Sequence, residues 1–112
     1  MAASAESDFT QRSDALLRAL QTELDAFDPD ELEADLAGGV LRIHLPGKRT
    51  CVLNRQAAVS QIWMAEGATA WHFAFDPAQR AWIDTKGRGE LRRLLAEVLS
   101  QRLGRTIELA DA

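Results

Sequence analysis

The residues best suited to chemistry in this chain are carboxylates crowded into one short segment. Seven acidic residues fall within thirteen positions, and no Lys or Arg interrupts them. They form an acidic cluster of Glu23, Asp25, Asp28, Asp30, Glu31, Glu33 and Asp35. Carboxylate oxygens are hard donors that suit Mg²⁺, Ca²⁺, Mn²⁺ or iron. The same charges would also attract a basic protein partner.

Pro29 divides the acidic cluster between two expected elements. The residue before a proline disfavours helical backbone, so we expect the preceding helix to end near Phe27. Asp25 and Asp28 then lie at a helix C-terminus, where the helix dipole makes each exposed carboxylate cost about 0.3–1 kcal/mol. Because stability alone does not favour this placement, it indicates a functional role. The alternative is a solvated face that protects an edge strand.

Beyond the proline the hydrophobic period changes to two, which predicts a strand with one face in water. Apolar residues from Leu32 to Leu36 alternate there with three acids, Glu31, Glu33 and Asp35. Successive acids on that wet face are about 6.8 Å apart, so all three cannot chelate one ion. We therefore predict shallow, weak and unselective cation binding.

Histidine and cysteine add little to this donor set. His44 and His72 are the only histidines, and neither belongs to a zinc-binding pattern. If Phe73 faces the core, His72 points to the open face of the sheet, as an accessory metal ligand or as a plain solvated histidine. The single cysteine, Cys51, excludes an internal disulfide and most thiolate metal sites.

Two helices are expected at the ends of the chain. Apolar residues from Phe9 to Phe27 recur at spacings of three, four and seven, with Ser7 as the expected N-cap. The helical period returns over residues 90–103, and Gly104 is the expected C-cap.

About six strands are expected between the helices, because short runs of strand character alternate with glycine and proline turns. After the acidic strand they cover residues 40–45, 50–54, 60–65, 70–75 and 81–84. Since no helix interrupts the strands, we expect an α+β fold, a two-layer sandwich with both helices on one face of an antiparallel sheet.

A second candidate surface surrounds Trp63. Alternation places Ile62 and Trp63 on opposite faces of their strand. If the helices cover Ile62, Trp63 is exposed and suits a protein interface, with Asn54, Arg55 and Gln56 as its polar rim. The alternative is a tryptophan covered by a loop.

Length and composition limit the organisation and the partners. A chain of 112 residues with 46% apolar content fits one domain over residues 1–112, with residues 1–7 as a loose tail. Residues 1–37 carry ten acids and two bases, whereas the rest carries seven acids and eleven bases. The two parts of the chain therefore carry opposite net charges. This distribution argues against a nucleic-acid binder, which would need one broad basic surface. No targeting signal or membrane-spanning run is present, so we expect a cytoplasmic protein without membrane contacts.

Catalytic motifs are missing from the sequence. We find no Ser/His/Asp set, no supported Cys/His pair and no phosphate-binding glycine loop, so we expect no enzyme. A ferroxidase would need several converging ligands in a closed site, which the open acidic cluster does not predict.

The order of the short motifs resembles the bacterial branch of the frataxin family. An acidic first helix and strand precede the segments 38–41, 54–56, 61–63, 71–73 and 82–83, which read GGVL, NRQ, QIW, WHF and WI. The resemblance extends from about Phe9 to Leu109. It implies an α-β sandwich that binds Fe²⁺ and Fe³⁺ weakly and regulates iron–sulfur cluster assembly, with other divalent cations able to substitute.

The resemblance also implies which residues act. Iron would bind an acidic ridge made of Asp25, Asp28, Asp30, Glu31, Glu33 and Asp35. The partners would be a cysteine desulfurase, through the acidic edge including Glu23, and an iron–sulfur scaffold protein, through Asn54, Gln56 and Trp63. A monomer is expected without metal.

The chain departs from this family pattern at the end of the first helix. Bacterial members tend to carry further acids there, whereas this chain has Gln21, Thr22 and Ala26, with Glu23 displaced by one position. We therefore expect lower iron affinity at the helix end. An alternative function is a small acidic chaperone, which would bind an unfolded client through apolar patches and normally dimerise.

Overall fold

One antiparallel sheet forms the centre of the protein. The computed structural model describes the backbone of residues 5–109 and the side chains of residues 8–109. Each strand pairs with the next along the chain, in the order β1-β2-β3-β4-β5-β6. The strands are β1 (Glu33–Ala37), β2 (Val40–Leu45), β3 (Arg49–Gln56), β4 (Gln61–Glu66), β5 (Thr69–Asp76) and β6 (Ala81–Asp84). Short 3₁₀ turns, η1 (Pro46–Lys48) and η2 (Ala57–Val59), flank β3.

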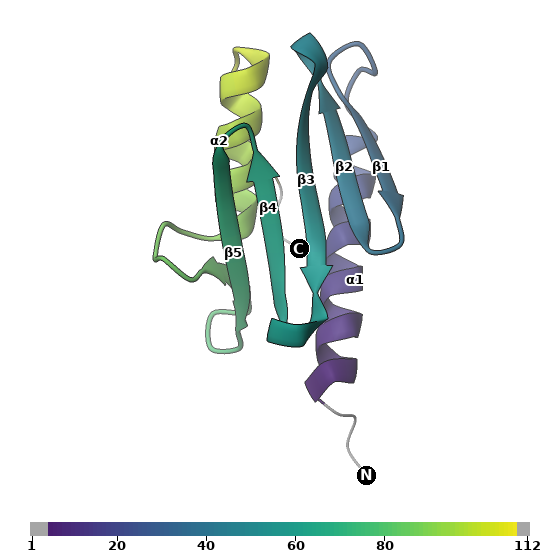
Figure 1. Ribbon diagram of the computed structural model, residues 1–112. Coiled ribbons are helices and arrows are strands. Elements are labelled where there is room, and N and C mark those ends of the chain that lie inside the picture. Colours follow the sequence, from purple (N-terminus) through teal and green to yellow (C-terminus); the bar gives the residue numbers. More distant parts are fainter. Residues whose placement is uncertain (1–4, 110–112) are drawn as a thin grey trace.

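Two helices cover one face of this sheet. Helix α1 (Ala5–Leu24) lies behind β1 to β3, and α2 (Leu91–Leu103) lies behind β4 and β5 (Figure 1). Among the described residues, no helix covers the other face of the sheet. The predicted α+β fold, a two-layer sandwich around an antiparallel sheet, is therefore confirmed.

The core lies between the two layers, where the apolar faces of the helices pack against the apolar face of the sheet. Leu20 of α1 and Leu95 of α2 are fully buried against inward-facing strand residues such as Ile43 and Phe73. Cys51 is also fully buried, and this burial, followed by the nearby Glu66 carboxylate, raises the pKa of its thiol to about 12. Cys51 is therefore unsuited to act as a thiolate ligand.

Helix α1 differs from expectation at both ends. It begins at Ala5, so Ser7 lies inside the helix and is not its N-cap, and only residues 1–4 of the expected tail lie outside the described residues. It ends at Leu24 and not near Phe27, because Phe27 N donates to Leu24 O at 3.0 Å. Such bonds over three residues tighten the chain beyond the regular helix.

Strand β1 also begins later than expected. The amides of Glu31 and Leu32 both donate to Asp28 O, at 2.8 and 3.2 Å, which closes a turn around Pro29. The strand then starts at Glu33. Glu31 was expected on the wet face of the strand, but it belongs to this turn.

The ends of α2 agree with the sequence. The Glu90 side chain accepts hydrogen bonds from the amides of Arg92 and Arg93, and Gly104 adopts the left-handed conformation at φ 70°. Within the described part of the chain, no helix is long and apolar enough to cross a membrane.

Candidate functional site

The acidic cluster lies along one edge of the sheet. Strand β1 is an edge strand, and the loop of residues 25–32 joins it to α1. Asp25, Asp28, Asp30, Glu33 and Asp35 are all exposed. Within the loop, Asp28 Oδ1 accepts a hydrogen bond from Asp30 N at 2.9 Å, which fixes the turn after Pro29. Local backbone geometry therefore presents these carboxylates to solvent.

Two members of the cluster differ from expectation because arginines pair with them. Glu23 bonds Arg92 of α2, whose side chain is only 7% exposed. Glu31 holds Arg105 by two hydrogen bonds, Nε to Oε2 at 2.9 Å and Nη2 to Oε1 at 2.8 Å. The sequence indicated seven unneutralised acids, but Glu23 and Glu31 each form an ion pair with an arginine. They are also the two that are only partly exposed.

The remaining five carboxylates make no ion pair with any residue of the described part of the chain. Asp35 lies directly opposite Arg42 in the β1–β2 register, but the two side chains form no ion pair. The edge of the sheet thus keeps an excess of negative charge after all the structural pairs are counted.

A shallow hollow of about 470 Å³ brings part of the ridge together. Asp25 lines it from the loop, Glu33 and Asp35 line it from β1, and His44 lines it from β2. His44 is exposed and lies opposite Glu33 in the strand register. Sequence reasoning did not assign His44 to this group. The missing signal was the register across the Gly38-Gly39 hairpin, which places the two residues side by side.

His72 does not join the acidic group. It lies on β5, whereas the ridge lies along β1 at the edge of the sheet. Its ring stacks on Trp63, with ring centroids 4.1 Å apart and planes at 9°. Three strands separate β1 from β5, so His72 lies away from these carboxylates, and an accessory metal role for it stays a prediction.

No group of three or more His, Cys, Asp or Glu side chains among the described residues converges tightly enough to hold a metal ion. The donors of the ridge are exposed carboxylates spread along a loop and a strand. Such hard oxygen donors attract Fe²⁺, Mn²⁺ or Mg²⁺, but ligands that do not converge give weak and exchangeable binding. Shallow and weak cation binding at this edge therefore stays a prediction.

The second candidate surface forms on the open face of the sheet. Trp63 lies opposite Asn54 on one side and His72 on the other, and Gln56 lies opposite Gln61. The indole Nε1 of Trp63 donates to Gln61 Oε1 at 2.8 Å. Trp63 is partly covered by these contacts, in contrast to the exposed side chain expected from the sequence.

Arg55 was expected at the rim of Trp63 but lies elsewhere. Alternation along β3 directs it away from the face that carries Asn54. Its side chain lies over Gly39, where an added Cβ would meet Arg55 Nε at 2.6 Å. Because Gly39 has no side chain, the Arg55 guanidinium can occupy this space.

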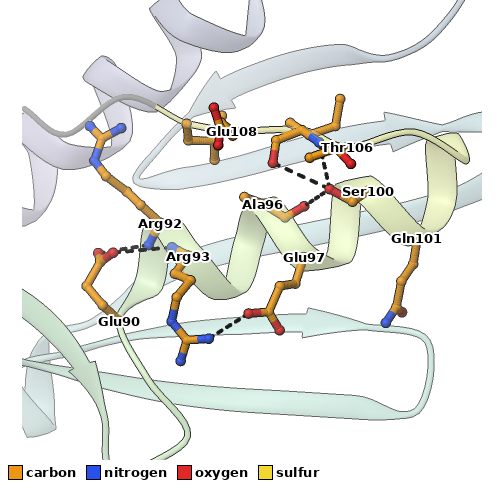
Figure 2. A pocket seen from close by; sticks show the side chains of 11 residues that line it. Glu90, Arg92, Arg93, Ala96, Glu97, Ser100, Gln101, Thr106 and Glu108 are labelled. Carbon is orange, nitrogen blue, oxygen red and sulfur yellow. Dashed lines mark hydrogen bonds and ion pairs between the residues drawn. The ribbon is translucent and has the colours of Figure 1, made fainter.

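Another hollow, of about 900 Å³, lies between α2 and the tail of residues 104–109. Figure 2 shows its lining, with Arg93 and Glu97 paired along the helix and Ser100 facing the tail. It contains none of the predicted metal or partner residues.

A frataxin-like domain profile matches residues 2–105 of this chain. The chain belongs to the frataxin family. One relative, from Delftia acidovorans, is 30% identical over 109 residues, which cover 94% of this chain and 96% of the relative. Another, from Dechloromonas aromatica, is 34% identical over 105 residues and covers 93% and 97%. Both carry the name iron-sulfur cluster assembly protein CyaY.

Solved frataxins share the fold. The frataxin of Psychromonas ingrahamii matches with a TM-score of 0.84 at 20% identity, covering 95% of this chain and 98% of that one. The trimeric yeast frataxin, solved in complex with ferrous iron, matches with a TM-score of 0.65 at 26% identity, covering 94% and 91%. The acidic edge on β1 and the Trp63 face on β4 lie on the same six-stranded sheet.

Proposed function

We propose that this frataxin binds iron weakly at its acidic edge and acts without catalysis as an adaptor and regulator of iron–sulfur cluster assembly. The observation that carries the proposal is the row of five exposed and unpaired carboxylates along the α1–β1 loop and β1. The names of the bacterial relatives support the pathway. The ferrous complex of the yeast frataxin supports the metal.

The proposed iron-binding residues are those of the ridge that remain unpaired: Asp25, Asp28, Asp30, Glu33 and Asp35. His44 joins them, because it lines the same hollow as Asp25, Glu33 and Asp35. Glu31 contributes only when Arg105 releases it. Affinity is low in this proposal because each cation keeps much of its water shell and meets only one or two carboxylates at a time.

The same edge would dock a cysteine desulfurase through that enzyme's basic surface. Exposed charges steer association and are screened by salt, so the contact should form fast and weaken as ionic strength rises. The Trp63 face would contact the iron–sulfur scaffold protein, with Asn54 and Gln56 beside the indole. The ridge on β1 and Trp63 on β4 are about 14 Å apart across the sheet, so the two partners would contact adjacent parts of this protein.

Amide spectra recorded during anaerobic Fe²⁺ addition test the metal part. We expect the signals of residues 25–35 and of His44 to shift or broaden, while those around Trp63 stay unchanged. Perturbations confined to other regions would rule out the ridge as the iron site. Mn²⁺ should perturb the same signals, because the site selects hard cations and not iron alone.

Charge reversal tests the docking part. Glu33→Lys with Asp35→Lys should weaken binding to a bacterial cysteine desulfurase by at least about tenfold at low salt, and by less at high salt. Glu97→Lys is the matched control, since Glu97 is an exposed acid on α2 outside the ridge. Equal effects of the ridge and control variants, compared per charge, would show that only net charge matters.

The chaperone alternative finds less support in the structure. Client-binding chaperones need an apolar patch, but Val59, at 52% exposure, is the only large hydrophobic residue exposed among those described. A single exposed valine on η2 does not make such a patch.

A further inference from the structure

The tail that follows α2 places one cation directly on the acidic ridge. Arg105 and Glu31 are 74 positions apart in the chain, yet they form a two-point guanidinium–carboxylate pair. The Arg105 guanidinium also lies over Phe27, 5.7 Å from the ring centroid. A planar fork that matches the carboxylate and contacts an aromatic face is a favourable geometry for arginine. The pair also lowers the pKa of Glu31 and raises that of Arg105.

The backbone holds Arg105 at this place whether or not the pair forms. Before it, Gly104 N donates to Ser100 O at 3.0 Å. After it, Ile107 N donates to Ser100 Oγ at 2.8 Å, and the Ile107 side chain is only 5% exposed. Figure 2 shows Ser100 on α2 reaching the tail beside Thr106. A tether fixed on both sides keeps the guanidinium at a high effective concentration near Glu31.

The side chains, by contrast, are free to separate. The Arg105 side chain is 51% exposed and that of Glu31 is 33% exposed. A hollow of about 260 Å³ opens beside them, lined by Phe27, Asp28 and the tail. The Glu23–Arg92 pair is different, because Arg92 is only 7% exposed and has no comparable access to water. Of the two ion pairs in the acidic cluster, only Glu31–Arg105 can exchange its cation without opening the core.

We propose that Arg105 is an internal competitor for the ridge: its guanidinium occupies Glu31, and a basic partner must displace it to use that carboxylate. The inference rests on the proposed docking function of the ridge and adds its regulation. A partner then binds with its full affinity only to the fraction of molecules in which Glu31 is released. The partner chemistry that best replaces Arg105 is another arginine, since a lysine ammonium cannot form the two-point contact.

A double-mutant cycle with an octa-arginine peptide as the probe tests this competition. The variants are Arg105→Gln, Glu31→Gln and their combination, with affinities measured at low salt. Arg105→Gln should bind the peptide about two- to fivefold tighter than the wild type, which is the range of an exposed ion pair. In the Glu31→Gln background the same change should bring a smaller gain, because no carboxylate is left to release.

Two further variants separate geometry from charge. Arg18→Gln removes an equal charge from an exposed pair with Asp14 on α1, away from the ridge. It should change peptide affinity less than Arg105→Gln does. Arg105→Lys keeps the charge but loses the two-point contact, so its affinity should lie between those of the wild type and Arg105→Gln.

The outcomes distinguish this inference from the proposed function. Equal gains from Arg105→Gln in both backgrounds, or no peptide binding near Glu31, would overturn the competition. Desulfurase binding that depends on Glu33 and Asp35 would leave the docking function in place in that case. Conversely, a positive cycle with the peptide, together with no desulfurase binding by any variant, would keep the competition and reject the docking partner.

Discussion

The Trp63 indole and the His72 imidazole stack in parallel across the open face of the sheet, with centroids 4.1 Å apart and planes at 9°. They are direct neighbours in the β4–β5 register, and Gln61 accepts the indole N–H at 2.8 Å. One ring face and the polar edge of Trp63 are therefore already engaged. The indole is held in one orientation before any partner binds, which reduces the entropy lost on docking.

On the proposed docking of the Trp63 face to the iron–sulfur scaffold protein, Trp63→Ala should weaken that binding by about 30-fold, the range of a central aromatic anchor. His72→Ala should weaken it by about two- to tenfold, because the stacking contact that orients the indole is lost. Calorimetric titration of the scaffold protein with each variant measures both effects. Val59→Ala, on the exposed turn η2, is the control and should bind like the wild type. A His72→Ala affinity equal to that of the wild type would show that the stack does not orient Trp63 for binding.

Arg102→Gln should lower the melting temperature by at least about 5 °C. Arg102 in α2 donates to both oxygens of Glu66, at 2.8 and 2.9 Å, and the Glu66 side chain on β4 is only 7% exposed. Removing the arginine leaves a buried carboxylate without its cation, which is strongly destabilising. Thermal unfolding followed by circular dichroism checks this, with Arg18→Gln as the control for loss of an exposed pair. Adding Glu66→Gln should restore part of the loss, and failure to do so would mean that the charge of Glu66 is not the cause.

Asp84→Asn should destabilise the protein at neutral pH but not in strong acid. Asp84 is 2% exposed at the end of β6, and both of its carboxylate oxygens bond the Arg88 guanidinium. These hydrogen bonds lower the pKa of Asp84 from 3.8 to about 2. A carboxyl group with a lowered pKa stabilises the fold fully above its unfolded value of 3.8, and this contribution disappears as the pH falls towards 2.

Urea unfolding of the wild type and Asp84→Asn at a series of pH values measures this contribution. The difference in unfolding free energy should be about 1–2 kcal/mol at pH 7 and should shrink between pH 3.8 and pH 2. A difference that stays constant down to pH 2 would mean that the ionised carboxylate contributes nothing and that only shape matters.

Local sequence signals accounted for most of the fold. The Gly38-Gly39 hairpin and the Gly104 cap lie where the sequence placed them, and the change from a helical period to a period of two correctly predicted a helix followed by a strand. These signals are reliable because each depends on residues within a few positions. The end of α1 was misplaced because the residue before Pro29 marks only the last position a helix can reach, whereas bonds to the carbonyls of Glu23 and Leu24 end it earlier.

The sequence by itself determined that carboxylates crowd the α1–β1 junction and that Ile62 and Trp63 lie on opposite faces of their strand. Only the tertiary structure decided which of these acids are available. Glu23 and Glu31 are paired by Arg92 and Arg105, which are 69 and 74 positions away, and no local pattern contains such a separation. Strand pairing likewise places His44 opposite Glu33 of the ridge and His72 opposite Trp63. Charge and periodicity are properties of a segment, whereas a free carboxylate depends on how distant segments pack.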